Sequence, residues 1–537
     1  MRNLCVFLFI TSGISSNAQL VSEKWESCFG GTEWDQGNSV IKIDNGYLVY
    51  GNTESSDGDI QGHHGLSDAW LIKIDTLGNL LWTKCYGGSK GEYGEEILST
   101  DNSDFYLTGA GGSEDGDISY DPYPNSMDYW VVKVDSIGEI IWDRILGGTG
   151  IDWTRNAIVT DDGGIITLGI STSDDGDISN YYGGWDLWMV KLNSQGQKQW
   201  DMSLGGSGSE SGASVKQTSD GGYIVAGSTD GYGGGNYDTA CNHHFVGFMD
   251  AWVVKLDSLR NIEWQQCYGG TYHDGSKNIL ELDNGYLLLA STMSNDGDVI
   301  GFHGVAGNQE YGNDIWVIKL DFEGNIIWQN CLGGLHGDFA RNIFTTSDGG
   351  FMVVGSTSSD DGDVEGYNGI DTGIYDDVWL AKLDSLGNLT WQYCYGGGGF
   401  EEMYRGVVQK SDFNYVITLG TNTDEWQCGG MMWPDLRIVE LHDSTVGIKE
   451  TSSNLINVKV SPNPARENIV FSYDLPEINE NGSLMIFKPN GILINKINLE
   501  NNKDKIRYNC SHLEVGIYFY YISFSGSYKT GKFIIVK

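Results

Sequence analysis

The chain has 537 residues, with 32 lysines and arginines against 73 aspartates and glutamates and a formal net charge of −41. This acidic excess disfavours nucleic acid and anionic membranes as partners and favours cations or neutral ligands. The length exceeds that over which one compact core keeps growing, so we expect several modules.

Residues 1–18 have the order of a secretory signal peptide: one arginine, an apolar run and small residues before a cleavage site after Ala18. No later segment approaches the ~20 apolar residues that a membrane span needs. We therefore expect an exported mature chain without a transmembrane segment.

One hairpin sequence recurs over residues 19–441, as in WVVKLDSLRNIEWQQCYGG from Trp252 to Gly270. Seven tryptophans begin its second half, spaced 57 to 64 residues apart: Trp25, Trp82, Trp142, Trp200, Trp264, Trp328 and Trp391. Each repeat contains four short strand signals separated by Gly, Asp and Ser turns. Four-stranded sheets stacked around a ring form a β-propeller. We predict an all-β, seven-bladed propeller over residues 19–441.

The order of the strand signals predicts how this ring closes. The mature chain opens with a fourth-strand sequence, KWESCFGG, and the repeats end with a third-strand sequence, DLRIVEL at 435–441. We expect the N-terminal strand, about Trp25 to Phe29, to complete the last blade and so hide the open edge.

The turn of the hairpin, as in LDSLGNLTW, resembles the Asp-x-x-x-Gly-x-x-x-Trp docking motif of quinoprotein dehydrogenase propellers. The resemblance implies that Trp82 or Trp391 packs between blades, and it concerns the scaffold without indicating a quinone site. Glycine at the turn supplies a left-handed backbone conformation, and Arg260 is the one departure.

Long variable loops between the second and third strands are expected on one face of the ring, where function usually lies. Five of these loops contain Asp-Gly-Asp. Clustered carboxylates suit Ca²⁺, but aspartate also caps turns by accepting backbone N–H groups, and both interpretations stay open. The candidate Ca²⁺ ligands are Asp57, Asp59, Asp115, Asp117, Asp175, Asp177, Asp296, Asp298, Asp361 and Asp363.

Histidines are also concentrated in these loops. His243 and His244, in an unusual insertion, are the best histidine candidates for a metal. The aligned loop endings GHHG, GFHG, GYNG and NYYG place His64, His303, Asn368 and Tyr182 at one position. A position that accepts such different side chains is predicted to be structural.

Cysteines fill one register position in five repeats: Cys28, Cys85, Cys267, Cys331 and Cys394. Stacked sheets lie about 10 Å apart, whereas a disulfide needs roughly 4.4–6.8 Å between Cα atoms. We expect these cysteines to be buried free thiols. Cys241 and Cys428 could pair only if their loops cross the face.

The charge composition changes near residue 445. Residues 446–537 hold 11 basic and 8 acidic side chains, whereas the residues before them hold 21 basic and 65 acidic side chains. A polar linker is expected over 442–455. Residues 456–537 alternate strand signals with glycine turns, which predicts a small β-sandwich.

This tail resembles the type A C-terminal sorting domain of the type IX secretion system. The matching residues are Pro462, Asn463, Pro464, Gly516, Tyr518 and Lys537. The resemblance implies export through the type IX machinery and cleavage by its sorting protease, with the chain secreted or attached to the outer cell surface. The repeats resemble the Gly/Asp/Trp-rich propellers that such cargo carries.

Two functions are compatible with these features. The first is an extracellular binding or adhesion module with a glycan or protein ligand on the variable face. The alternative is a secreted glycan hydrolase or lyase that uses loop carboxylates. The sequence contains no Ser-His-Asp, nucleotide-binding or Cys-x-x-Cys motif, so we assign no catalytic residue and no cofactor other than candidate Ca²⁺.

Overall fold

The computed structural model of the protein describes residues 21–231, 248–308, 312–369, 376–397, 401–403, 405–411, 414–421, 434–443, 457–474, 482–488, 493–499, 503–513, 515–524 and 527–536. Their regular elements are all β-strands, β1 to β36. The chain divides into two compact units between Asp443 and Ser444. The predicted signal peptide lies outside the described residues.

Six sheets of the first unit have four antiparallel strands each, in sequence order. Their strands are β2 (Asp35–Ile43), β3 (Gly46–Thr53), β4 (Asp68–Ile74), β5 (Leu80–Tyr86); β6 (Glu92–Ser99), β7 (Phe105–Gly111), β8 (Asp128–Val134), β9 (Ile140–Leu146); β10 (Asp152–Val159), β11 (Ile165–Ser171), β12 (Asp186–Leu192), β13 (Lys198–Leu204); β14 (Glu210–Gln217), β15 (Tyr223–Thr229), β16 (Asp250–Leu256), β17 (Ile262–Tyr268); β18 (Asp274–Leu282), β19 (Gly285–Thr292), β20 (Asp314–Leu320), β21 (Ile326–Leu332); β22 (Asp338–Thr345), β23 (Phe351–Thr357), β24 (Asp377–Leu383) and β25 (Leu389–Tyr395).

A further sheet joins the two ends of this unit. It contains β26 (Glu401–Glu402), β27 (Val407–Ser411), β28 (Asn414–Thr421), β29 (Asp435–Asp443) and β1 (Val21–Phe29). β1 pairs antiparallel with β29, from Val21 opposite Asp443 to Phe29 opposite Leu436. The predicted closure by the N-terminal strand is therefore confirmed. β29 also includes the first two residues of the predicted linker.

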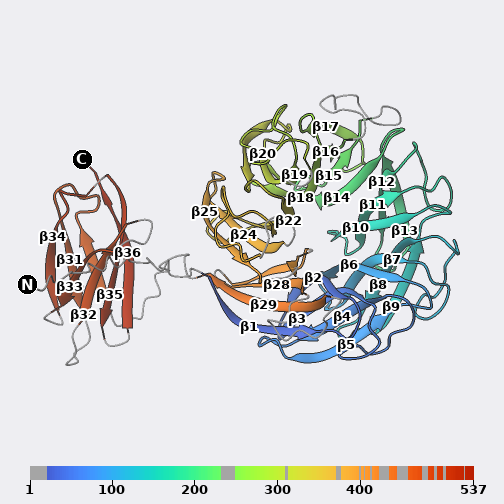
Figure 1. Ribbon diagram of the computed structural model, residues 1–537, viewed down its shortest axis with the longest axis horizontal. Helices are drawn as coiled ribbons and strands as arrows, with labels where there is room; N and C mark the ends of the chain where they lie inside the picture. The colour runs from blue at the N-terminus through green and yellow to red at the C-terminus, as the bar shows by residue number, and fades with distance from the viewer. Residues whose placement is uncertain are drawn as a thin grey trace, which may run out of the picture. The chain divides into compact units, whose positions relative to one another are not determined.

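The sheets of the first unit surround a central axis in a propeller-like arrangement (Figure 1). The first strand of each sheet lies nearest the axis and the fourth lies at the outside. Third strands such as β8 are buried along their whole length, because neighbouring sheets cover both faces. The apolar core is divided into layers between sheets, as where Leu187 and Met189 pack with Val225 and Trp252.

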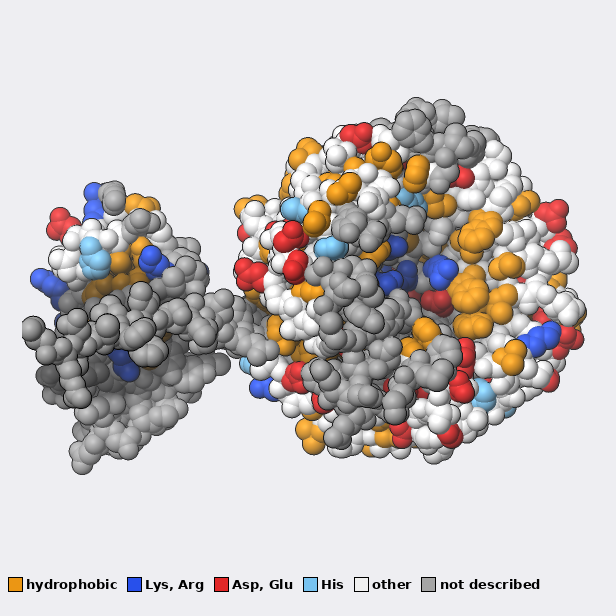
Figure 2. All heavy atoms as spheres, in the orientation of Figure 1, with side chains coloured by type: hydrophobic (Ala, Val, Ile, Leu, Met, Phe, Trp, Pro, Cys, Tyr) orange, Lys and Arg blue, Asp and Glu red, His pale blue; other side chains and the backbone are white. Residues whose placement is uncertain are grey.

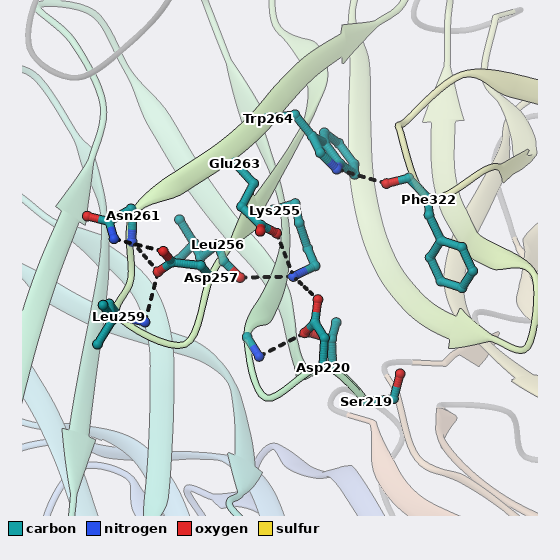
Figure 3. A network of polar contacts seen from close by, with 12 residues as sticks. Ser219, Asp220, Lys255, Leu256, Asp257, Leu259, Asn261, Glu263, Trp264 and Phe322 are labelled. Carbon is teal, nitrogen blue, oxygen red and sulfur yellow. Dashed lines mark hydrogen bonds and ion pairs between the residues drawn. The ribbon is translucent and has the colours of Figure 1, made fainter.

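The hairpin between the third and fourth strands is held by its own polar groups and by Asp220, from the turn between β14 and β15 (Figure 3). The Asp257 carboxylate accepts hydrogen bonds from the N–H groups of Leu259 and Asn261, both at 2.8 Å. Lys255 Nζ lies 2.8 Å from the Asp220 carboxylate and 3.0 Å from that of Glu263. The same turn contacts recur at Asp75, Asp135, Asp321 and Asp384. These bonds explain why the hairpin length is constant.

The turn glycine of each hairpin lies against the fourth-strand tryptophan of the preceding sheet. A Cβ atom at Gly78 would lie 2.5 Å from the Trp25 ring, and one at Gly387 would lie 2.6 Å from Trp328. Arg260 adopts a φ of 70° and places its guanidinium 4.9 Å from the Trp200 ring centroid, a cation–π contact. The prediction that these tryptophans pack between blades is confirmed.

The prediction of free thiols holds only in part. Cys85, Cys331 and Cys394 are free and buried, but Cys28 and Cys267 are disulfide-bonded. The prediction is wrong for these two because the spacing argument excludes bonds between equivalent positions and does not exclude a partner elsewhere. Cys241 and Cys428 lie outside the described residues.

The second unit has two sheets, of order β30-β31-β34 and β33-β32-β35-β36. The strands are β30 (Asn457–Ser461), β31 (Asn468–Asp474), β32 (Gly482–Phe487), β33 (Leu493–Leu499), β34 (Lys503–Asn509), β35 (Gly516–Phe524) and β36 (Ser527–Ile535). Phe471, Tyr520 and Phe533 from both sheets share one core, as in a sandwich.

The sorting-motif residues meet at the last strand of this unit. Asn463, between Pro462 and Pro464, accepts a 2.8 Å hydrogen bond from the N–H of Ile534. Gly516 pairs with Ile535, and Tyr518 stacks on Phe533 with ring centroids 5.7 Å apart. Lys537 lies outside the described residues.

Candidate functional site

The first strand of each four-stranded sheet in the first unit has a β-bulge after its third residue. In β18, for example, the pairing register shifts between Ser276 and Asn278. A bulge leaves one residue unpaired and redirects its side chain. The six unpaired residues are Asn38, Glu95, Arg155, Ala213, Lys277 and Arg341. All six line one cavity on the axis of the ring.

The residue after each bulge holds the neighbouring sheet by a hydrogen bond. The bonds are Ile97 N to Ser39 Oγ (3.3 Å), Asn156 Nδ2 to Glu96 Oε2 (2.8 Å), Val215 N to Asn156 Oδ1 (2.9 Å), Ser214 Oγ to Asn278 Oδ1 (2.9 Å), Asn278 Nδ2 to Asn342 Oδ1 (2.8 Å) and Asn342 Nδ2 to the Arg405 carbonyl (3.1 Å). Thr418 Oγ1 donates to the Gly37 carbonyl at 2.9 Å and links the last sheet to the first. This belt of hydrogen bonds fixes the bulged residues around the axis.

Two cavities, of about 690 and 310 Å³, share lining residues that include Lys277, Arg341 and Arg405. They are therefore two parts of one axial channel. The larger part is lined by Trp34, just before β2, and Glu54, just after β3. These strand ends adjoin the variable loops, so the wider mouth opens on the variable-loop face.

The charge of the channel is opposite to that of the chain. Its lining contains five cationic side chains, Arg155, Lys216, Lys277, Arg341 and Arg405, and three carboxylates, Glu54, Glu95 and Glu96. Figure 2 shows lysine and arginine side chains gathered at the centre of the ring, beside a hydrophobic patch. Basic residues are thus concentrated at the axis of a strongly acidic protein.

Among the described residues, the charges that act on Lys277 are repulsive. Burial and then the charges of Arg341, Arg405 and Arg155 lower its pKa to about 8. In the part of the chain that the structure describes, its ammonium group makes no hydrogen bond or ion pair. A buried charge without a counter-charge is disfavoured, so an anion bound beside Lys277 would be stabilised.

Two arginines of the channel are held in place. Arg405 reaches across the axis and donates hydrogen bonds to the carbonyls of Arg155 and Ala213, the latter at 3.4 Å. Arg155 lies 3.6 Å from the Glu95 carboxylate and stacks over Trp153, with its guanidinium 5.6 Å from the ring centroid. Burial raises the pKa of Glu95, and Arg155 opposes that shift.

Aromatic side chains form one wall of the wider mouth. The rings of Tyr93 and Trp153 lie 5.2 Å apart at 34°, and both side chains are half-buried. Trp153 Nε1 donates a 2.7 Å hydrogen bond to Glu95, which fixes the ring. Trp34 extends the same lining and is also half-buried.

The Asp-Gly-Asp residues bind the backbone of the connection between neighbouring sheets. Asp296 Oδ1 accepts a 2.7 Å hydrogen bond from the Thr271 N–H, and Asp298 Oδ2 accepts one of 3.3 Å from Gly269. The same two contacts recur at Asp57 and Asp59, Asp115 and Asp117, and Asp175 and Asp177, while Asp361 accepts one from Leu335.

These contacts favour the turn-capping interpretation. Among the described residues, no group of three or more His, Cys, Asp and Glu side chains is placed to hold a metal ion. Calcium binding by these aspartates stays a prediction, and His243 and His244 lie outside the described residues.

The residues at one aligned loop position make the same contact through their backbone. They are His64, Tyr182, His303 and Asn368. In each case the residue's N–H donates to the aspartate that begins the third strand: Asp68 (3.0 Å), Asp186 (2.6 Å), Asp314 (3.0 Å) and Asp377 (2.8 Å). A backbone contact does not depend on the side chain, which explains why four residue types occur there. The prediction of a structural role is confirmed.

The aspartate that begins a third strand lies beside the acidic residue that begins the first strand of the next sheet. A Cβ atom on Gly205 would lie 2.4 Å from Asp186 and 2.6 Å from Glu210, so each pair encloses a connecting glycine. Burial raises the pKa of Asp186 to about 6 and that of Glu210 to about 7. These carboxyl pairs join neighbouring sheets outside the channel lining.

The sequence contains a signal for the channel that the repeat pattern alone does not reveal. Each of the six bulged strands begins with an acidic residue, and the channel residue is always the fourth of the strand. Aligning the first strands on that acidic residue would bring Arg155, Lys277 and Arg341 into one column.

Comparisons with known proteins identify the tail. Residues 459–537 match the family described as the secretion system C-terminal sorting domain. No curated protein matches the chain. In the described residues, no helix is long and apolar enough to cross a membrane.

Solved structures with a similar arrangement share little sequence. BBS1N in complex with ARL6DN is 9% identical, with a TM-score of 0.40, covering 79% of this chain and 97% of its own. A puromycin hydrolase mutant is 12% identical, with a TM-score of 0.36, covering 73% and 50%. A putative exo-beta-1,3-galactanase from Bifidobacterium bifidum is 11% identical, with a TM-score of 0.29, covering 69% and 99%. Such distant likenesses carry no argument about function. The tail, by contrast, identifies the chain as type IX secretion cargo, a propeller-like repeat protein that is secreted or located at the cell surface.

Proposed function

We propose that the first unit is an extracellular binding module and that the wider mouth of its axial channel is the ligand site. One observation carries this proposal: Arg155, Lys277 and Arg341, which come from the first strands of three different sheets, share a bulge position and line the same cavity. A cavity of about 690 Å³ falls within the range of ~300–1,000 Å³ typical of small-ligand sites.

The position of the mouth supports the same function. It opens on the face of the variable loops, and variable loops around a rigid scaffold commonly determine binding. Export by the sorting domain places this face outside the cell, where it can meet glycans or proteins.

The alternative function, a glycan hydrolase or lyase that uses loop carboxylates, has less support. The described Asp-Gly-Asp carboxylates accept backbone hydrogen bonds in the connections between sheets. Paired carboxylates of a hydrolase need a suitable separation across a substrate. The Asp-Gly-Asp carboxylates instead bind backbone N–H groups of the fold.

Glycan and extracellular-protein arrays, probed with the full chain and with Arg341→Gln, test the proposal. We expect bound ligands whose signal falls at least tenfold in the variant, with no products after prolonged incubation. Binding that is unchanged in Arg341→Gln would exclude the channel as the site. Release of reducing sugars or unsaturated products would instead favour the enzyme.

A further inference from the structure

We infer that the channel mouth recognises a carboxylate-bearing saccharide, with the carboxylate at Lys277 and Arg341 and a sugar ring against the wall formed by Tyr93 and Trp153. This inference rests on the proposed function and names its ligand class. It depends on three features of the mouth: its charge, its aromatic wall and its buried hydroxyl groups.

The cationic wall selects an anionic group. The ammonium group of Lys277 lies among the charges of Arg341, Arg405 and Arg155, and no anion of the described residues pairs with it. A ligand carboxylate would supply the missing counter-charge, and a guanidinium binds a carboxylate with two parallel hydrogen bonds. The overall charge of −41 repels long polyanions, so the ligand must be small or carry few charges.

The aromatic wall selects a ligand that also has an apolar surface. Tyr93 and Trp153 come from neighbouring sheets, and both line the same cavity as Lys277. Ligand sites commonly combine such aromatic surfaces with a few placed polar groups. A sugar ring has C–H groups that can cover an aromatic face while its hydroxyl groups remain available for hydrogen bonds. A simple inorganic anion would use only the cationic wall.

Two buried hydroxyl groups of the cavity supply further polar contacts. Ser67 and Ser276 both line it and are only 2% and 4% exposed. Within the described residues, the Oγ atoms of both serines lack a hydrogen-bond partner. Buried polar atoms are rarely left unsatisfied, and sugar hydroxyl groups can donate to and accept from serine.

The test compares matched acidic and neutral saccharides by titration calorimetry with the full chain. The probes are tetragalacturonate and its methyl ester, for a carboxylate within a chain, and sialyllactose and lactose, for a terminal carboxylate. We expect at least one acidic probe to bind at least tenfold more tightly than its neutral counterpart, with an affinity that falls as salt rises.

Three variants locate the contacts. Lys277→Gln should remove the preference for the acidic probe, and Trp153→Ala should weaken the acidic and neutral probes alike. Lys84→Gln is the matched control, because Lys84 lies on the outer strand β5 and pairs with Glu139; it should leave binding unchanged. Lys277→Gln should also raise the melting temperature of the free protein, because it removes an uncompensated charge, so its loss of binding cannot be attributed to unfolding.

Other outcomes would overturn the inference. Equal affinity for acidic and neutral probes, lost in Trp153→Ala, would leave the proposed binding site intact but exclude carboxylate recognition. Competition by inorganic sulfate at the same concentration as the saccharide would indicate a simple anion site. If no saccharide binds while the arrays give a protein ligand that depends on Arg341, the proposed function stands and the ligand class is wrong.

Discussion

Trp25 Nε1 donates a 2.6 Å hydrogen bond to the carboxylate of Glu440, which lies 415 residues further along the chain. This bond joins β1 to β29 and so connects the two ends of the ring. The ends are also joined by apolar contacts, because Phe29 packs with Leu436 and Ile438.

Deleting residues 21–29 should destabilise the whole first unit. The deletion removes the buried Phe29 side chain and exposes the edge of β29, so we expect a loss above about 3 kcal/mol. Thermal unfolding followed by circular dichroism measures this loss, with Lys24→Ser, an exposed substitution on the same strand, as control. An unchanged melting curve would show that β1 does not close the ring.

Gly387→Ala should cost more than Gly349→Ala. Both glycines have a φ near 83°, but an added Cβ would lie 2.6 Å from Trp328 at Gly387 and meet nothing within 4 Å at Gly349. The left-handed backbone alone costs about 1–2 kcal/mol, and overpacking adds about 1–3 kcal/mol. Chemical denaturation measures the free energy of unfolding of both variants, and the difference between them reports the contact with Trp328. Equal losses of this free energy would exclude tight packing of the turn on Trp328.

The first unit should be more stable at pH 5 than at pH 8. Burial raises the pKa of Asp338 to about 7 and that of Asp274 to about 6, above an unfolded value near 3.9. The native state therefore binds more protons than the unfolded state between about pH 4 and 7, and its stability falls as the pH rises through that range. The pKa of His303 is also raised, by its hydrogen bond to Asp314, so the stability that His303 contributes is likewise lost as the pH rises.

Melting temperatures across this pH range test the effect, and Asp338→Asn should make the dependence shallower. A melting temperature that rises between pH 5 and 8 would contradict the raised pKa values. The turn aspartates have the opposite effect on stability below pH 4. Hydrogen bonds from Asn261 lower the pKa of Asp257, so stability falls as acid protonates this carboxylate and weakens the turn.

The calcium prediction has a direct thermal test. If Ca²⁺ binds the folded chain alone, an ion concentration 100 times the dissociation constant adds about 2.7 kcal/mol per independent site. Asp296→Asn combined with Asp298→Asn should then reduce the response to Ca²⁺ by one site. Mg²⁺ should substitute poorly, because it sheds its water reluctantly. Identical melting curves in chelator and in Ca²⁺ would leave these aspartates with their turn-capping role alone.

A chain that ends at residue 445 should enter the periplasm and remain there. The truncation removes the sorting domain at 459–537 and leaves the strands of the first unit intact. Immunoblots of cell fractions and medium measure its location, with the full chain as control. Wild-type amounts of the truncated protein in the medium would contradict a requirement for the tail.

Features that repeat locally were predictable from the sequence. The turn around Asp257 uses contacts within five residues, and its tryptophan packs at the same place in successive blades, so periodicity indicated both the strands and the docking contact. The order of strand signals also predicted that β1 would join β29. The tail was recognisable because several motif residues occur in a specific order.

The channel was decided by the tertiary structure. The acidic residue that begins each first strand marks the position in the sequence. The residues three places later, among them Asn38, Glu95, Arg155, Lys277 and Arg341, differ in chemistry, and only the bulges turn them toward the axis. Ring closure then brings together side chains that are hundreds of residues apart, including Arg405, which crosses to Arg155. The disulfide bonding of Cys28 and Cys267 was missed because the spacing of equivalent positions in neighbouring repeats says nothing about a partner elsewhere in the chain.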